Sequence, residues 1–444
     1  MNIAIIGGGY VGLVSAACFA EFGVDVVVAE TEPRRLERLR RGEIPIYEPS
    51  LDTLMARNTA AGRLSFTGVV AEAIVNAEAV FIAVGTPTRR GDGHADLTYV
   101  FSAAEQVLAG LDHEAVLVTK STVPVGTGRR LAELARARRP DLSVEIASNP
   151  EFLREGSAIN DFMRPDRIII GAETPRAEAL LRKLYRPLNL IEAPVLVMSL
   201  ETAELTKYAA NAFLAMKVTF INEMADLCEA VGGDVHDVAR GMGLDGRIGR
   251  KFLHPGPGFG GSCFPKDTQA LARIATEAGA PSRLTEAVVA ANEARKSSLS
   301  DRVLHAAGGS IRGSAITVLG LAFKPETDDM RDAPSIPLIR GLIDAGANVT
   351  AFDPAAMSVA RPLLPDNVVY AENVDAALKG ADLLVIVTEW NSFRALPPHR
   401  LTTLMRGNII VDLRNIFEPI AIRAAGFRYY PVGRSHPPIA GSCS

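Results

Sequence analysis

The chain has 444 residues, a formal charge of −4, 48% hydrophobic residues and 22% charged residues. This composition is typical of a globular protein and argues against disorder, and the near-neutral charge argues against a nucleic-acid partner. No apolar run is long enough to cross a membrane, so we expect no membrane partner, and the start of the chain lacks the pattern of a signal peptide. Four cysteines are too few for a disulfide framework, which favours a cytoplasmic location, and the scattered histidines argue against a metal site.

The first thirty residues predict a dinucleotide-binding βαβ unit. A strand over 3–6 leads into a glycine turn with the pattern GxGxxG, then a helix, and then a strand over 26–29 that ends in Glu30. Gly7 permits the tight turn, Gly9 lets the backbone approach a pyrophosphate, and Gly12 lets the helix pack on the strand. Glu30 can accept hydrogen bonds from both ribose hydroxyls and would repel a 2′-phosphate, so we expect NAD as the cofactor rather than NADP.

Strands and helices continue to alternate through a domain that we place at residues 1–195. Further strands are predicted over 79–84, 115–120, 144–147 and 167–171. In such sheets, ligands bind beyond the carboxyl ends of the strands. We therefore expect a cleft lined by the polar residues that follow them: Thr86, Ser121, Thr122 and 149–155.

A long helix over 201–231 lacks Gly and Pro and opens a central helical and dimerisation domain at residues 196–300. Lys207 and Asn211 are four residues apart, so they share one face of this helix. Alternation restarts near residue 314, with strands predicted up to the Gly320 turn, up to Asp353, over 381–388 and over 408–413, so we expect a second doubly wound domain at 301–432. Its turn, GLAFKP, lacks the full glycine fingerprint, although a pyrophosphate could still bind there. Residues 433–444 are expected to form a loose tail.

The segment HPGPGFGGSCFPKD at 254–267 surrounds Cys263 with glycines and places Lys266 and Asp267 just beyond it. The glycines allow a ligand to approach the backbone, and Lys266 with a helix N-terminus would favour the thiolate. From the local pattern alone, Cys263 is either a nucleophile or an inert buried thiol. Cys18 and Cys228 lie on apolar faces of predicted helices, so we expect both in the core.

Motifs along nearly the whole chain resemble the UDP-glucose/GDP-mannose dehydrogenase family. They are GGGYVGL at 7–13, STVPVGT at 121–127, NPEFLREG at 149–156, ETAELTKYAANAFLAMKVTFINE at 201–223, GPGFGGSCFPKD at 256–267 and GLAFKPETDDMRDAPS at 320–335. The resemblance implies an α/β fold with two Rossmann-like domains, one for NAD and one for a nucleotide sugar. They would be joined by a long central helix and a helical middle domain, in a homodimer.

The same resemblance implies a four-electron oxidation of UDP-glucose to UDP-glucuronate with two NAD. Cys263 would add to the aldehyde to form a thiohemiacetal, which can lose a second hydride to become a thioester. Lys207 and Asn211 would stabilise the oxyanions. Asp267 would work with Lys207 in positioning a water molecule.

Three further residues have implied roles in catalysis. Thr122 would hold that water or the sugar hydroxyl. Glu151 and Glu155 both follow a strand, and either could be the general base for thioester hydrolysis. The resemblance favours Glu151 as the base and Glu155 for placing cofactor or substrate, although the sequence alone does not separate them.

The implied binding residues form two sets. For the cofactor they are Gly7, Gly9, Val11, Gly12, Glu30, Arg35, Thr86, Thr122, Glu155, Lys266 and Arg331. For UDP-glucose they are Glu151, Phe152, Leu153, Arg154, Glu155, Lys207, Asn211, Arg247, Phe252, Leu253, His254, Pro255, Gly256, Gly260, Lys324 and Arg414. Among these, Arg247 could reach across a dimer interface, and His254 could present only its backbone.

Three alternatives remain open. A relative could act on another nucleotide sugar, such as GDP-mannose or a UDP-N-acetylhexosamine, because substrate choice depends on few contacts. A two-electron hydroxyacid dehydrogenase would need no cysteine. A non-catalytic NAD-binding sensor would have no use for a nucleophile.

Overall fold

The computed structural model describes residues 1–89 and 93–434 and divides the chain into two compact units. The first unit holds Met1–Ala210 and Arg273–Pro281, and the second holds Asn211–Ala272 and the chain from Ser282 onward. Across the described ranges, no helix has both the length and the apolar character needed to cross a membrane. Most of the tail expected at 433–444 lies outside the described residues.

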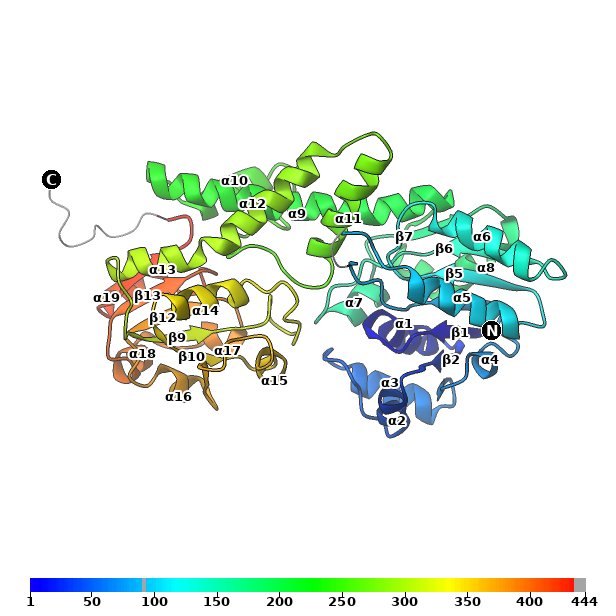
Figure 1. Ribbon diagram of the computed structural model, residues 1–444, viewed down its shortest axis with the longest axis horizontal. Helices are drawn as coiled ribbons and strands as arrows, with labels where there is room; N and C mark the ends of the chain where they lie inside the picture. The colour runs from blue at the N-terminus through cyan, green and yellow to red at the C-terminus, as the bar shows by residue number, and fades with distance from the viewer. Residues whose placement is uncertain (90–92, 435–444) are drawn as a thin grey trace. The chain divides into compact units, whose positions relative to one another are not determined.

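The first unit is built on an eight-stranded sheet in the order β3-β2-β1-β4-β5-β6-β7-β8 within the described residues (Figure 1). Its strands are β1 Asn2–Ile6, β2 Asp25–Ala29, β3 Leu64–Thr67, β4 Ala79–Ile82, β5 Ala115–Thr119, β6 Val144–Ser148, β7 Ile168–Ala172 and β8 Val195–Met198. The first six strands follow the order of a dinucleotide-binding sheet and are parallel. The chain reverses between β6 and β7, which pair antiparallel.

Helices cover both faces of this sheet. They are α1 Tyr10–Glu21, α2 Pro33–Arg40, α3 Leu51–Ala60, α4 Val70–Ala73, α5 Thr98–Gly110, α6 Thr127–Arg138, α7 Ala158–Met163 and α8 Pro175–Leu184, followed by the 3₁₀-helix η1 Arg186–Ile191. Alternate strand residues point to opposite faces, so Ile3 and Ile5 join the core with α1, α3, α7 and α8. Ala4 and Ile6 join the core with α4, α5 and α6.

The helix predicted over 201–231 is confirmed as α9, which runs over Leu200–Val231. The first turns of α9 pack closely on the first sheet. A Cβ added to Gly171 of β7 would lie only 2.7 Å from the Cβ of Ala203 on α9. The segment expected to be largely helical continues with α10 Val235–Gly243, α11 Phe264–Glu277, α12 Arg283–Ser297 and α13 Leu299–Ala307.

The second unit contains a parallel six-stranded sheet in the order β11-β10-β9-β12-β13-β14, again within the described residues. Its strands are β9 Ala315–Leu319, β10 Asn348–Phe352, β11 Val369–Tyr370, β12 Leu383–Ile386, β13 Ile409–Asp412 and β14 Arg428–Pro431. The helices α13 and α14 Ser335–Asp344 contribute to the core on one face. The core on the other face includes residues of α16 Val374–Leu378, α17 Asn391–Arg394, α18 Pro398–Leu404 and α19 Pro419–Ala424, and the short helix α15 spans Met357–Ala360.

The two predicted doubly wound sheets are therefore present. Every strand predicted from an apolar run is confirmed to within a few residues, whereas β3, β8, β11 and β14 were not predicted. All four lie at the edges of their sheets, where a strand needs less apolar sequence than a central one. Cys18 and Cys228 are buried, as expected.

Candidate functional site

The glycine turn after β1 has the geometry that a dinucleotide requires. Gly7 has φ +111°, a conformation that other residues rarely adopt, and a Cβ on Gly12 would lie 2.0 Å from the Gly7 carbonyl oxygen. Nothing lies within 4 Å of where a Cβ on Gly9 would be, so the backbone there is open to a ligand. Gly9 caps α1, whose N-terminus can face a phosphate, and the half-buried Val11 lies in its first turn.

Glu30 stands directly after β2 and is buried. Its Oε2 accepts a hydrogen bond from the Gly8 amide at 3.1 Å, and its Oε1 accepts one from the Glu32 amide at 2.8 Å. Arg35 in α2 forms an ion pair with Oε2 at 3.3 Å. The carboxylate is thus tied to the glycine turn, and its remaining lone pairs can accept ribose hydroxyls. The turn, the helix end and this acid fit NAD.

Two of the expected cofactor residues meet beyond the ends of β4 and β5. The Thr86 hydroxyl donates to the Thr122 carbonyl oxygen at 2.9 Å. The neighbouring Ser121 hydroxyl donates to the Val84 carbonyl at 2.6 Å. These hydrogen bonds connect the polar segments that follow β4 and β5 at the carboxyl ends of the strands.

The segment after β6 brings Glu151 and Lys207 together. The Lys207 ammonium lies 3.3 Å from Glu151 Oε1, and both side chains are almost fully buried. Glu151 Oε2 also accepts the Leu153 amide at 2.5 Å, and Lys207 lies over the Phe152 ring at 5.2 Å. Arg154, in contrast, is exposed and forms an ion pair with Asp161 at 2.6 Å.

Glu48, which sequence reasoning missed, ties this segment to the glycine turn. Its buried carboxylate accepts the Gly156 amide at 2.6 Å and the Ala158 amide at 2.8 Å, and it also accepts the Tyr10 hydroxyl. Burial raises the pKa of Tyr10, so this hydroxyl remains a donor. No local pattern marks Glu48, because its partners lie far away in the sequence.

In the second unit, Cys263 directly precedes α11, which fulfils the expectation of a helix N-terminus beside the thiol. Cys263 is half-buried, and its Sγ lies 3.5 Å from the Ser262 hydroxyl. The positive end of the helix favours the thiolate. One turn into α11, the buried Asp267 accepts the Asn211 amide at 2.6 Å and forms an ion pair with Lys266 at 2.8 Å.

Three polar side chains that the sequence reasoning missed hold the glycine-rich loop before Cys263. Asn222 on α9 accepts the Gly256 amide at 2.8 Å, and the Arg295 guanidinium donates to the Gly256 carbonyl at 2.6 Å. Asn292 on α12 bonds both the amide and the carbonyl of Phe259, at 2.8 and 3.0 Å. These bonds hold the loop through its own backbone atoms. They would therefore remain if side chains within the loop were changed.

Two loop glycines are required by packing within the unit. A Cβ on Gly256 would lie 2.9 Å from Arg414 Nη1, and one on Gly260 would lie 2.4 Å from the Asp332 carbonyl oxygen. The space that a side chain would take at both positions is therefore filled by the protein itself, and the expected approach of a ligand to this backbone stays a prediction. Arg414, which Gly256 accommodates, also donates to the Phe323 carbonyl at 2.8 Å.

The remaining charged residues of the predicted substrate and cofactor sets differ in their surroundings. Lys324 is half-buried and lies over the Phe323 ring at 5.3 Å. Arg331 forms an ion pair with Asp329 at 2.8 Å, and Arg247 forms an exposed one with Asp245 at 2.5 Å. Arg414 forms an ion pair with Glu389 at 3.0 Å. Each of these cations is already paired or stacked, so a bound phosphate would share it with a protein partner.

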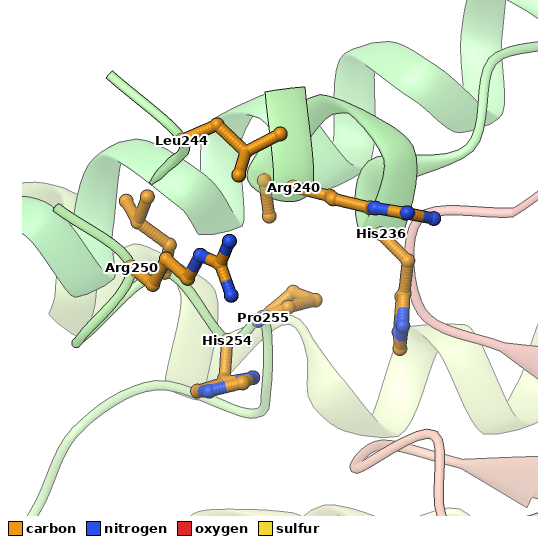
Figure 2. A pocket seen from close by; sticks show the side chains of 8 residues that line it. His236, Arg240, Leu244, Arg250, His254 and Pro255 are labelled. Atoms are coloured by element: carbon orange, nitrogen blue, oxygen red, sulfur yellow. The ribbon is translucent and has the colours of Figure 1, made fainter. Parts of the chain in front are cut away.

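The loop 252–256 borders a surface hollow of about 360 Å³ between α10 and Leu253–Pro255. Figure 2 shows the Arg250 guanidinium pointing into this hollow above His254, with Arg240 lying over His236. The hollow is lined by His236, Ala239, Arg240, Leu244, Arg250, Leu253, His254 and Pro255. His254 is exposed there, whereas Leu253 and Pro255 are buried, and Phe252 has φ +66°.

Comparison with known proteins covers almost the whole chain. Models of the UDP-glucose/GDP-mannose dehydrogenase family match residues 1–189 (NAD binding domain), 201–294 (central domain) and 317–419 (UDP binding domain). A UDP-glucose 6-dehydrogenase of Rhizobium meliloti is 55% identical over 98% of this chain and 100% of its own. A solved UDP-glucose dehydrogenase of Pyrobaculum islandicum is 41% identical, covers 98% of both chains and has a TM-score of 0.89. A UDP-D-ManNAc dehydrogenase of Pyrococcus horikoshii is 27% identical, covers 98% of this chain and 99% of its own, and has a TM-score of 0.85.

Proposed function

This chain belongs to the UDP-glucose/GDP-mannose dehydrogenase family, and we propose that it oxidises UDP-glucose to UDP-glucuronate with two NAD. The observation that carries the proposal is the presence of both halves of the required chemistry. The first unit has a glycine turn closed by an acid that suits NAD. The second has a half-buried cysteine at the start of a helix.

The chemistry requires a nucleophile, because an aldehyde lacks the hydrogen-bearing alcohol carbon from which a second hydride can leave. When bound, NAD supplies the hydride acceptor, one molecule for each oxidation. The Cys263 sulfur forms a bond to the aldehyde carbon, and the aldehyde oxygen takes a proton, which gives a thiohemiacetal. Loss of hydride from that carbon, together with the proton of its hydroxyl group, gives a thioester. Water then breaks the carbon–sulfur bond, which leaves a carboxylate and restores the thiol.

We assign the polar groups as the family resemblance implied. The Lys207 ammonium and the Asn211 amide, one turn apart on α9, stabilise the oxyanions. Glu151 serves as the general base for hydrolysis, which is supported by its burial and its contact with Lys207. Asp267 orients the Asn211 amide, to which it is bonded, and Thr122 holds the reacting water or hydroxyl.

A count of NADH formed per UDP-glucose tests the proposal. We expect two, and we expect Cys263→Ser to reduce turnover by roughly 10³-fold with NADH limited to one per sugar. Cys228→Ser, a buried thiol outside the proposed chemistry, is the matched control. Two NADH per sugar in Cys263→Ser would contradict the thioester route, and one in the wild type would contradict the four-electron reaction.

A second nucleotide sugar is the alternative substrate, since a structure named for UDP-D-ManNAc shares the fold at 27% identity. The higher identity to proteins named for UDP-glucose, 55% and 41%, favours UDP-glucose. Comparing kcat/KM for UDP-glucose, GDP-mannose and UDP-N-acetylmannosamine distinguishes them. A preference for either rival sugar would replace UDP-glucose in the proposal.

We further propose that the active form is a homodimer associating through α9. The side chains of Phe213, Phe220 and Leu227 are exposed and seven residues apart, so they form a stripe along one face of the helix. Exposed aromatic and aliphatic side chains aligned on one helix face are typical of an interface. Phe220→Asp should therefore yield a particle with the 47.3 kDa mass of one chain in light scattering, whereas the wild type has twice that mass.

The proposed nucleophile also favours a reducing compartment such as the cytoplasm. An accessible nucleophilic thiol is the form of cysteine most readily oxidised. Loss of activity with oxidant, restored by dithiothreitol in the wild type, would support this requirement.

A further inference from the structure

The first unit buries a second lysine that the proposed chemistry does not use. Lys120 directly follows β5, and its side chain is almost fully buried. Its ammonium donates to Asn149 Oδ1 at 3.0 Å and to the Tyr185 hydroxyl at 3.2 Å. It also lies near the rings of Phe162 and Tyr185, at 5.7 and 5.8 Å from their centroids.

A buried ammonium without a carboxylate partner is costly, because desolvation disfavours the charged form. Lys120 forms no ion pair within the part of the chain that the structure describes, since the nearby Glu151 is taken by Lys207. Desolvation lowers the pKa of Lys120 to about 8, while the charge of Glu151 opposes this shift and that of Lys207 adds to it. Two lysines thus share the field of one buried carboxylate.

The contacts of Lys120 lead directly to the proposed general base. Its partner Asn149 lies two residues before Glu151, and Asn149 is itself fixed by three other bonds. Its amide donates to the Thr119 carbonyl at 2.9 Å, its Nδ2 to the Ile169 carbonyl at 2.8 Å, and its Oδ1 accepts the Tyr185 hydroxyl at 2.6 Å. Burial raises the pKa of Tyr185, so this hydroxyl is a donor across the working range of pH.

We propose that Lys120 is a positioning residue for the Glu151–Lys207 pair. Its ammonium fixes the strand end that carries Glu151 through the hydrogen bond to Asn149, and it lies close enough to Glu151 for the two charges to interact. The inference rests on the roles proposed above for Glu151 and Lys207. Besides these two groups, the titratable side chains that act on Lys120 are Tyr185 and the buried thiol of Cys18.

The test is the pH profile of kcat in Lys120→Met, which removes the charge and keeps most of the apolar volume. Removing a positive charge raises the pKa of a nearby carboxyl, so the acid limb should move to higher pH by about half a unit or more. We expect kcat near neutral pH to fall about tenfold, with the KM for UDP-glucose changed less than about twofold.

Matched variants separate this role from a structural one. Tyr185→Phe removes a partner of Lys120 but no charge, so its acid limb should stay in place even if the melting temperature falls. Lys183→Met removes an exposed lysine of α8 and should behave as the wild type. An unshifted acid limb in Lys120→Met would overturn the proposal, whatever happens to stability.

A second variant covers the case in which Lys120→Met does not fold. Asn149→Asp gives Lys120 a carboxylate partner and cancels its field at Glu151, so the acid limb should again move to higher pH. An unchanged limb there overturns the proposal. Glu151→Gln tells the two hypotheses apart: full activity in that variant removes the base assignment itself, whereas lost activity with an unshifted Lys120→Met profile rejects only the role of Lys120.

Discussion

The first six strands of the first sheet follow the same order as the six strands of the second sheet, but the turns after the first strand of each are closed in different ways. After β1, Gly9 caps α1 at once, and Glu30 takes only the Gly8 amide of the turn. After β9, no helix begins until α14 at Ser335. There the buried Asp353, which follows β10 as Glu30 follows β2, accepts the amides of Leu321 and Ala322 at 2.7 and 3.1 Å.

This difference shows how one architecture can bind two kinds of ligand. The first turn leaves amides and a helix end for a pyrophosphate. In the second turn, the Leu321 and Ala322 amides already donate to Asp353. These amides are therefore not available to a pyrophosphate, which argues against pyrophosphate binding at the GLAFKP turn. Phosphates of a nucleotide sugar would then depend on cationic side chains such as Lys324 and Arg414.

Removing the acid that closes the turn after β9 should give the largest loss of stability. Asp353→Ala would leave several buried amides and the Trp390 indole N–H without their acceptor, so we expect unfolding to become easier by about 3 kcal/mol. Urea denaturation measures this change. The exposed Asp366→Ala is the control, and an equal loss in both variants would mean that Asp353 does not close the turn.

A buried acid of the first unit, Glu204, should make the stability of the protein depend on pH. Glu204 on α9 accepts the Gly126 and Gly128 amides at 2.7 Å each, yet burial raises its pKa to about 7. The folded state therefore binds this proton more tightly than the unfolded state, and stability should fall by about 2 kcal/mol as pH rises from about 4.5 to 7. Glu204→Gln, followed by urea denaturation across this range, should lose that slope. A slope equal to that of the wild type would contradict the assignment.

Glu30 in the first unit should determine the selectivity for NAD over NADP. Glu30→Gln keeps an acceptor for the Gly8 amide but removes the charge that repels a 2′-phosphate. We expect the preference for NAD over NADP in kcat/KM to fall about tenfold. The exposed Glu43→Gln should leave the preference unchanged. Steady-state kinetics with both cofactors decides, and an undiminished preference in Glu30→Gln would assign selectivity to other groups.

The smallest effect is expected at a side chain near the second turn. Lys324→Met should raise the KM for UDP-glucose about fivefold, because one phosphate-neutralising charge is lost, while the KM for NAD stays constant. Lys379→Met, an exposed lysine of the same unit, serves as the control. A rise in the KM for NAD instead would place Lys324 with the cofactor.

Features that depend on short-range sequence pattern could be predicted before the fold was known. Apolar runs marked the central strands, the absence of Gly and Pro marked α9, and the spacing of Gly7, Gly9 and Gly12 predicted a turn whose geometry is present. These features are readable because a strand, a helix or a tight turn is limited by the conformations of neighbouring residues.

The contacts between side chains that are distant in the sequence could be seen only in the folded chain. Lys207 with Glu151, Lys120 with Asn149, and Asp353 with the turn after β9 are pairs separated by many residues. Nothing in the local sequence marks such pairs, because each is created where parallel strands and a crossing helix bring their ends together. Burial then makes these contacts matter, since a charge or an amide removed from water must find its partner inside the protein.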